Sequence, residues 1–225
     1  MEKPLFPSKY MRITQGYMEG SHQSSYAIDN ADKDGGISNI YAPFTGIIKK
    51  IYPNDANEVW LESEDPVDYP DGTKDYMTIM FAHANDTQDL FVGKRIRQNE
   101  AFYKEGTKGN ATGNHCHIEC GKGRFSGTGW HKNNAGYWSI NNSKRPEECL
   151  WIDPTITILN NHNYEFKKIS TDVVDKKEEA SEGIVSKPVE ETIKGKKNKT
   201  FIAPKNDLYG VYLKEKQKLI IEEIS

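Results

Sequence analysis

Cysteine, net charge and long apolar runs are all scarce in this chain, and each shortage excludes a class of protein. The 225 residues include 3 cysteines, a number too small and odd for a disulfide-stabilised scaffold. A formal net charge of −3, without a basic stripe, does not favour binding to nucleic acid. No apolar run approaches the ~20 residues that a transmembrane helix needs, so we expect no insertion into a membrane.

The remaining composition describes a soluble protein with an ordinary core. Hydrophobic residues make up 36% of the chain and charged residues 28%. A chain of this length forms one domain of about 150 residues together with a smaller element.

The stretch most informative about function lies at residues 109–120, Gly-Asn-Ala-Thr-Gly-Asn-His-Cys-His-Ile-Glu-Cys. It places His115 and His117 two positions apart after a glycine-rich turn. Residues two apart on a β-strand point to the same side, roughly 6–7 Å from each other. One ring is then able to bind a metal ion while the other handles protons. Glu119 continues this face, and the residues in between form an opposite face that is small and apolar like a core.

An upstream segment supplies further metal-binding side chains. His22 and Asp29 flank a strand-like run at residues 26–28. Catalytic zinc usually has three protein ligands from His, Asp and Glu, with water in the fourth position. His22, Asp29 and one of His115 and His117 would form such a set.

A fourth histidine lies between these two clusters. The apolar residues 76–82 predict a β-strand, and His83 follows it directly, where its ring can reach a site from the rim. A lone histidine is usually structural or solvated, but four of the six histidines lie in these motifs. Taken together they indicate function, whereas His131 and His162 lie outside the motifs and are expected to be structural or solvated.

In order and content these segments resemble the lysostaphin-type zinc endopeptidases, which cut peptide cross-links in bacterial cell walls. The resemblance covers about residues 12–121, roughly half of the chain. It includes a strand turn like the family's Ala-Pro followed by Gly-Val, and a glycine-rich stretch before the last two histidines. The matching segments are His22, Ala27–Asp29, Tyr41–Ile48, Phe81–His83, Phe91–Ile96, Gly106–Gly113 and His115–Glu119.

This resemblance implies a zinc cofactor and a set of site residues. The implied zinc ligands are His22, Asp29 and His117, and the implied catalytic pair is His83 and His115. Zinc lowers the pKa of bound water to about 7 and polarises a carbonyl, as hydrolysis of an amide bond requires. Histidine suits proton transfer because its ordinary pKa lies near 6.5. The sequence does not assign the two catalytic histidines to separate steps.

Spacing is the one departure from the family. The family commonly has three residues between its first histidine and the aspartate, whereas six separate His22 from Asp29. Asp32 and Asp34 are therefore alternatives to Asp29, although some phage lysins of this type look similar in the longer spacing. Glu119 is expected either to hydrogen-bond an imidazole behind the metal or to form a salt bridge.

Some of the same residues also fit other functions. The longer spacing is the one feature that favours a catalytically inactive structural or wall-binding protein on this scaffold. Residues 42–48 are also similar to the opening strand turn of biotinyl and lipoyl carrier domains, but no hairpin with a cofactor lysine follows. Cys116 and Cys120 beside the histidines suggest a structural zinc site, which strand alternation disfavours. We expect buried free thiols, with a disulfide to Cys149 as the alternative.

Few segments have helical periodicity, so we expect a mainly β fold, an antiparallel sheet of the barrel-sandwich-like lysostaphin type. Strands are predicted within residues 12–52 and 76–121, separated by a polar insert at 53–75. Residues 122–158 are rich in glycine, asparagine and aromatic side chains, with one more strand at 138–140. These rings either wall a substrate groove or cover the sheet as core.

The composition changes again toward the C-terminus. We predict an endopeptidase domain over residues 1–165, a charged linker over 166–199 and a short segment over 200–225. The last segment is too short for an independent core. It is expected to pack on the main domain, associate with another subunit, or dock on a virion or wall.

The start of the chain bears on where the protein acts. Residues 1–7 lack the apolar core of a signal peptide. For an enzyme that hydrolyses peptidoglycan peptides, this fits a phage lysin, located in the host cytoplasm before lysis or on the virion. The Lys-, Asn- and Ile-rich composition is compatible with an AT-rich genome and a Gram-positive host.

Overall fold

Short apolar runs form the strands of the computed structural model, which describes residues 1–170, 190–193 and 196–199 except residues 54 and 135. The elements are β1 (Tyr10–Gln15), the 3₁₀ turn η1 (Gly20–His22), β2 (Ile28–Asn30), β3 (Asn39–Tyr41), β4 (Gly46–Tyr52), β5 (Glu58–Ser63), β6 (Val67–Asp68), β7 (Lys74–Asp75), β8 (Met77–Ala82), β9 (Arg95–Ile96), β10 (Ala101–Lys104), β11 (Cys116–Lys122), β12 (Trp130–Lys132), β13 (Trp138–Ile140), β14 (Ser143–Lys144), α1 (Pro146–Cys149), β15 (Trp151–Ile152), β16 (Thr157–Asn160), β17 (Lys167–Lys168), β18 (Glu190–Ile193) and β19 (Lys196–Lys199).

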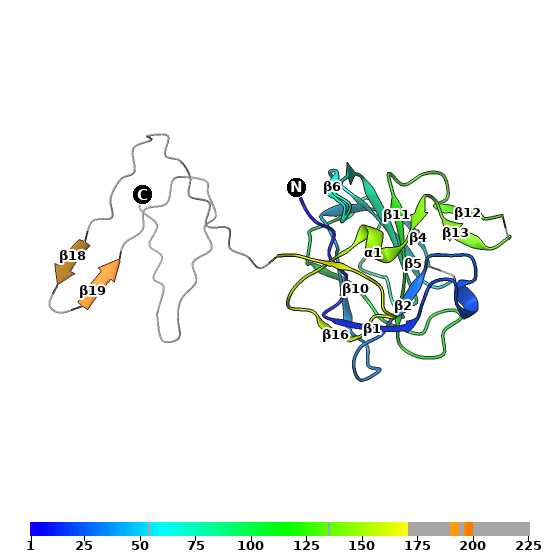
Figure 1. Ribbon diagram of the computed structural model, residues 1–225, viewed down its shortest axis with the longest axis horizontal. Helices are drawn as coiled ribbons and strands as arrows, with labels where there is room; N and C mark the ends of the chain where they lie inside the picture. The colour runs from blue at the N-terminus through cyan, green and yellow to red at the C-terminus, as the bar shows by residue number, and fades with distance from the viewer. Residues whose placement is uncertain (54, 135, 171–189, 194–195, 200–225) are drawn as a thin grey trace. The chain divides into compact units, whose positions relative to one another are not determined.

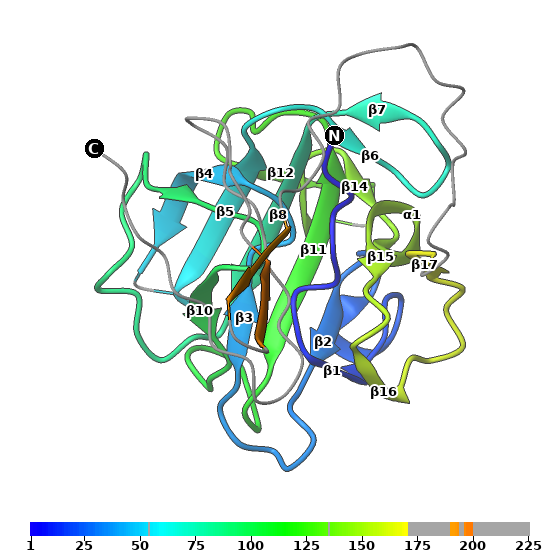
Figure 2. The ribbon, with the colours of Figure 1, turned by 90° about the vertical axis from the view of Figure 1, so that its left-hand side faces the viewer.

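One large sheet organises the molecule. Its strand order is β16-β1-β2-β11-β8-β5-β4-β9, with β14 paired to β11 beside this path. Figure 2 shows β11, β8, β5 and β4 side by side in this sheet. The pairs from β1 to β9 are antiparallel, and β16 joins the edge in parallel. The prediction of a mainly β fold is confirmed.

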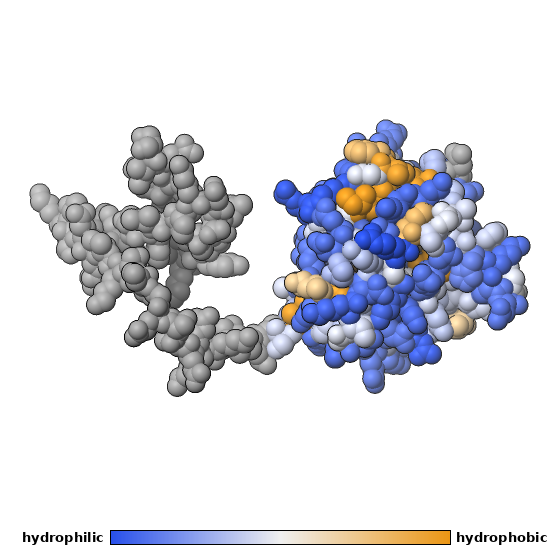
Figure 3. All heavy atoms as spheres, turned by 90° about the horizontal axis from the view of Figure 1, so that it is seen from above, coloured by the Kyte–Doolittle hydropathy of each residue, from blue (hydrophilic) through white to orange (hydrophobic). Residues whose placement is uncertain are grey.

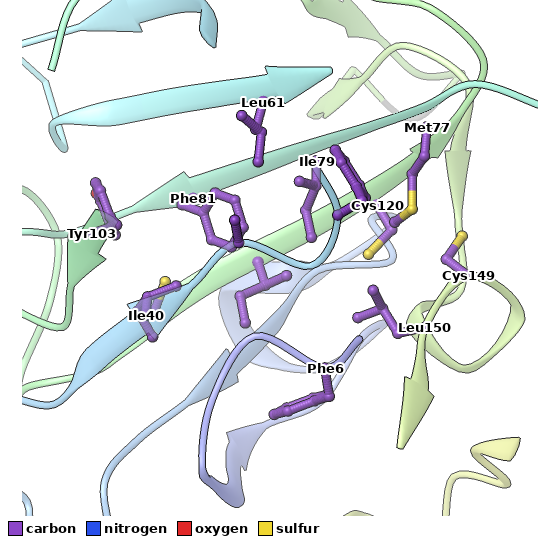
Figure 4. Close-up of a cluster of buried hydrophobic side chains, with 14 of the residues drawn as sticks. Phe6, Ile40, Leu61, Met77, Ile79, Phe81, Tyr103, Cys120, Cys149 and Leu150 are labelled. Atoms are coloured by element: carbon purple, nitrogen blue, oxygen red, sulfur yellow. The ribbon is translucent and has the colours of Figure 1, made fainter. Parts of the chain in front are cut away.

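Both faces of the sheet are covered near its centre. All six residues of β8 are buried, because β11 and β5 flank it and side chains pack on either side. On one face Leu61, Ile79 and Phe81 belong to the main hydrophobic core (Figure 4). On the other face Trp60 and Met80 form a smaller cluster. This second face also carries the odd-numbered residues of β11.

The predicted polar insert at residues 53–75 is wrong for its middle part. Residues 58–63 form β5, a strand inside the sheet that pairs with β4 and β8. Acidic residues at 58, 62 and 64 mask the apolar run Val59–Leu61, which is too short to stand out. The predicted strand at 138–140 is confirmed as β13, which pairs with β12 in a hairpin (Figure 1).

The three cysteines are free and buried, as predicted. Cys120 and Cys149 lie together in the main core (Figure 4). Burial raises the pKa of the thiols of Cys116 and Cys120 well above the ordinary value, which keeps them protonated. They behave as small hydrophobic side chains.

The chain divides into two units, Met1–Val173 and Val174–Ser225. In the second, β18 and β19 pair as an antiparallel hairpin. The predicted segment 200–225 and most of the predicted linker lie outside the described residues, and the proposed boundaries stay predictions. On the face of the first unit that Figure 3 shows, most residues are hydrophilic, with hydrophobic ones in separate areas. In the described part of the chain, none of the helices has the length and apolar character of a membrane span.

Candidate metal centre

Strand pairing brings two distant segments of the sequence together. His117 on β11 lies directly opposite Asp29 on β2, and on its other side opposite Ala82 on β8. Directly opposed residues of neighbouring strands project from the same face of a sheet. The face that carries His117 therefore also carries Asp29.

One carboxylate oxygen is the centre of the cluster. Asp29 Oδ1 lies 3.0 Å from His117 Nδ1, 3.2 Å from His22 Nε2 and 3.6 Å from His115 Nε2. The potential ligand atoms of His22, Asp29 and His117 all lie within 4.8 Å of one another. The structure thus brings together the three predicted ligands despite the long spacing between His22 and Asp29. The chain between them bends at Ser24, whose φ is +66°.

Backbone carbonyls fix the orientation of three histidine rings. His22 Nδ1 lies 3.0 Å from Gly16 O, His83 Nδ1 lies 2.7 Å from Lys108 O, and His115 Nδ1 lies 2.8 Å from Gly113 O. A carbonyl oxygen only accepts hydrogen bonds, so Nδ1 of each ring carries the proton. In the neutral ring Nε2 is then left with a lone pair.

His83 is held by its backbone as well as its side chain. Its φ is +83°, a left-handed conformation that is uncommon for histidine. Its N–H donates to Ala56 O at 2.7 Å. Its ring lies 4.6 Å from the ring of His115 between centroids. Such backbone strain is typical of functional positions.

The electrostatics of the cluster favour positive charge. Burial opposes ionisation of Asp29, but hydrogen bonds from His117 and His22 outweigh it and hold the pKa of the carboxyl well below its ordinary value. Burial also disfavours a charged His117, yet Asp29 and Glu119 on its two sides raise the pKa of that ring to about 10. Burial lowers the pKa of His83 to about 4.

Glu119 lies behind His117. This carboxylate is buried, and its Oε1 lies 3.6 Å from His117 Nε2. Its Oε2 accepts hydrogen bonds from Ser139 Oγ at 3.2 Å and from the N–H of Ile140 at 3.3 Å. Glu119 thus connects His117 to β13. The sequence predicted either a contact with an imidazole or a salt bridge for Glu119. Its contact with His117 is of both kinds.

The donor set fits a zinc ion. In neutral His117 a proton on Nε2, beside Glu119, leaves Nδ1 as an acceptor, and this Nδ1 and Nε2 of neutral His22 both face Asp29 Oδ1, which is also an acceptor. Three acceptors that converge without a hydrogen between them repel one another. A proton or a cation relieves this repulsion, and two imidazoles with one carboxylate are a common ligand set for catalytic zinc. In the same sense, Asp29 and Glu119 raise the pKa of His117, so negative charge at this site favours a bound cation.

A hairpin that the sequence did not place borders the cluster. Asn133, in the β12–β13 turn, donates through Nδ2 to Ser24 O at 2.7 Å, and Tyr137 Oη donates to Gln23 Oε1 at 3.1 Å. These contacts join the hairpin to the segment that follows His22. The glycine- and aromatic-rich composition of residues 122–158 was the available signal for this role.

The remaining candidate residues lie outside the cluster. The N–H of Asp32 donates to Glu105, and the side chain of Asp34 is 75% exposed, so neither alternative to Asp29 joins the cluster. His131 is exposed on β12, and His162 lies 3.6 Å from Glu19.

Comparison with known proteins gives partial likenesses of fold. No protein-family model matches the chain, and no curated protein matches it. The chain is similar to a catalytic-domain mutant of the prophage-encoded M23 protein EnpA from Enterococcus faecalis, with 19% identity over 54% of this chain and 88% of that one and a TM-score of 0.40. It is similar to the catalytic domain of the antimicrobial peptidase lysostaphin from Staphylococcus simulans, with 19% identity over 51% and 80% and a TM-score of 0.37. It is also similar to a chain of the SpoIIQ–SpoIIIAH pore-forming complex, with 17% identity over 67% and 92% and a TM-score of 0.41.

Proposed function

We propose that this chain is a zinc-dependent endopeptidase that hydrolyses peptide bonds in bacterial peptidoglycan. The observation that supports the proposal most is the convergence of His22, Asp29 and His117 within 4.8 Å, with the rings of His83 and His115 beside them. A structural role does not require three imidazoles to face one buried carboxylate oxygen. We also keep the phage origin, with action from the host cytoplasm or the virion, as a prediction.

The ligands would be His22, Asp29 and His117. A zinc ion bound there supplies a Lewis acid for the scissile carbonyl and lowers the pKa of water to about 7. Asp29 supplies a negative charge to hold the ion, because its pKa stays well below neutral. Glu119, whose Oε1 lies 3.6 Å from the outer nitrogen of His117, pairs with that ring and helps to keep it oriented.

Two further rings handle protons. His83 and His115 each donate Nδ1–H to a backbone carbonyl, which leaves Nε2 as the acceptor. His115 is therefore placed to take a proton from the attacking water. His83, whose pKa burial lowers to about 4, binds a proton less readily and, once charged, gives it up readily to the departing amide nitrogen. The side chains of His115 and His117 are 12% and 16% exposed, so a substrate reaches this side of the cluster.

Metal content and activity of three alanine variants test the proposal. The variants are His117→Ala, His115→Ala and, as a matched control, His131→Ala, which lies outside the cluster. We expect about one zinc ion per chain in the wild type, in His115→Ala and in His131→Ala, and none in His117→Ala. On purified Gram-positive cell walls, we expect chelator-sensitive loss of turbidity for the wild type and His131→Ala. Loss of a proton-transfer group slows His115→Ala by about 10²-fold or more.

Two outcomes would contradict the proposal. A wild-type protein that holds zinc but clears no wall type would indicate an inactive structural protein on this scaffold. Stoichiometric zinc in His117→Ala would show that the ligand assignment is wrong.

A further inference from the structure

Glu58 extends the row of residues that carries the metal centre. His117 lies opposite Ala82, and the pairing of β8 with β5 runs through Phe81 opposite Val59. The next residue of β5, Glu58, therefore stands beside Ala82 and on the same face as His117. Neighbouring strands lie about 4.8 Å apart, so the Cα atoms of Glu58 and His117 are separated by about 10 Å.

The carboxyl of Glu58 is poorly screened from the charges of the metal centre. Ala82 between them has only a methyl side chain. The charges of His117 and Glu119 both act on Glu58, His117 favouring its ionised form and Glu119 opposing it. A group bound at the metal centre would thus lie within electrostatic reach of Glu58.

The groups around Glu58 offset only part of the free-energy cost of burying an ionised carboxylate. Trp130 on β12 donates a side-chain hydrogen bond to it, whereas a carboxylate has about four acceptor positions. Burial and the nearby Asp55 raise the pKa of Glu58 to about 7, against the effects of Trp130 and His117. A cation that binds beside such a carboxyl strongly stabilises its ionised form.

Glu62, on the same strand, differs from Glu58 in having positively charged partners. It lies four residues along β5, on the same face, and is buried. Its Oε1 lies 3.2 Å from Arg124 Nη1 and 3.4 Å from Lys49 Nζ, and its Oε2 accepts from the N–H of Phe125 at 2.6 Å. The fold supplies Glu62 with its cations from within the chain, whereas the groups that act on Glu58 include two further carboxyls.

We propose that Glu58 binds a primary ammonium group of the peptide substrate. This inference rests on the proposed function, because the peptide must also reach the metal centre. A distance of about 10 Å corresponds to about three residues of extended chain at 3.3 Å each. The amine would therefore belong to a residue about three positions from the bond that is cut, either as the free amino terminus of a cross-bridge or as the side-chain amine of a diamino acid.

Matched peptides and variants of the full, zinc-loaded chain test this. The peptides are one cross-bridge peptide with its amino terminus free or acetylated, and one stem peptide with its side-chain amine free or acetylated. The substitution is Glu58→Gln, which keeps an oxygen for the indole of Trp130. The control is Glu64→Gln, which removes a surface carboxylate paired with Arg95 just after β5. Zinc content is measured for every variant.

We expect acetylation of one amine to raise the KM of the wild type about 10-fold, as the loss of one charge-assisted contact does. Glu58→Gln should raise the KM for the same free-amine peptide about as much and leave its KM for the acetylated form unchanged. The kcat and zinc content should stay within about twofold, and Glu64→Gln should match the wild type throughout. A higher KM after acetylation of the amino terminus would identify the amine of a cross-bridge. A higher KM after acetylation of the side chain would identify that of a diamino acid.

Failure of this inference is distinguishable from failure of the proposed function. If the wild type cleaves both forms of each peptide equally well, or Glu58→Gln weakens free and acetylated forms alike, Glu58 does not recognise an amine although the enzyme is active. If nothing is cleaved, calorimetric binding of the same peptides to the wild type and Glu58→Gln decides the question. A preference for the free amine that Glu58→Gln abolishes would support the inference, and equal binding would overturn it.

Discussion

Glu119 is the residue whose role is most open to direct measurement. It contacts the nitrogen of His117 that faces away from Asp29, and it is held by Ser139 and Ile140. Carboxylates in this position orient a metal-binding imidazole and raise its basicity. We therefore expect Glu119→Gln to weaken zinc binding about 10- to 100-fold while the protein stays folded. Competition with a fluorescent chelator measures this affinity.

The control for this prediction is again Glu64→Gln, on the surface. A zinc affinity of Glu119→Gln equal to that of the wild type would show that Glu119 is held only by the hairpin and does not act on the metal site.

Glu105 gives the chain a pH-dependent stability. It is fully buried, its Oε2 accepts from the N–H groups of Asp32 and Ser38, and its Oε1 has no hydrogen-bond partner among the residues that the structure describes. Burial is the main cause that raises the pKa of Glu105 to about 7, nearby Asp32 adds to the rise, and Arg12 opposes it. The ordinary value is 4.5. Between these two values the folded state keeps a proton that the unfolded state releases.

The free energy of unfolding contributed by Glu105 therefore falls as pH rises from about 4.5 to about 7, and is constant above. We expect Glu105→Gln, which cannot ionise, to gain stability relative to the wild type by about 2 kcal/mol between pH 5 and pH 8. Urea unfolding at the two pH values measures this difference, in which the shifts of other groups cancel. An equal effect of the substitution at both values would mean that Glu105 ionises normally in the folded protein.

Two tryptophans of one hairpin are expected to differ in role. Trp130 packs edge-to-face on buried Trp60, with ring centroids 5.1 Å apart, whereas Trp138 is 60% exposed. We expect Trp130→Ala to lower the free energy of unfolding by about 3 kcal/mol. Trp138→Ala should change it by less than about 0.5 kcal/mol but slow clearing of cell walls, because Trp138 is free to contact substrate.

Urea unfolding and the turbidity assay on the same two variants measure these effects. If Trp138→Ala clears walls at the wild-type rate, the exposed part of the hairpin does not contact substrate. The aromatic rings would then serve only to cover the sheet.

The strands differ in how far the sequence predicts them. The run before His83 is long and apolar enough to be recognised, and the alternation in β11 predicts which residues face the core. In contrast, β5 combines three apolar residues with acidic neighbours, so its central position in the sheet could not be read from the pattern. Glu58 was missed for this reason. The pairing partners of each strand come from tertiary packing, which local composition does not encode.

At the scale of the whole molecule, residue types predicted the candidate site better than spacing did. The structure brings His22 and Asp29 within 3.2 Å although six residues separate them. Spacing alone left Asp32 and Asp34 open, because a loop that bends at Ser24 has no periodicity to measure. The carbonyls of Gly16, Lys108 and Gly113 that orient the rings are backbone groups, which carry no sequence signal.

The end of the first unit can be located by truncation. The predicted domain ends at residue 165, but Phe166 packs on the core, with its ring centroid 5.8 Å from that of Phe6. Lys167–Lys168 forms β17, which pairs with β15, and the N–H of Ile169 donates to Ile152 O. A chain that stops at 165 loses all of these contacts, whereas one that stops at Val173 keeps them.

We expect the chain that ends at Val173 to hold about one zinc ion and to unfold within about 2 °C of the full chain, because it contains every residue of the metal centre. The chain that ends at 165 should unfold at least about 5 °C lower, since loss of a packed aromatic ring and a strand pair costs about 2 kcal/mol. Calorimetry and metal analysis of both forms check this, with His117→Ala in the longer form as the zinc-free control. Loss of zinc on truncation at Val173 would instead contradict the assignment of every zinc ligand to the first unit.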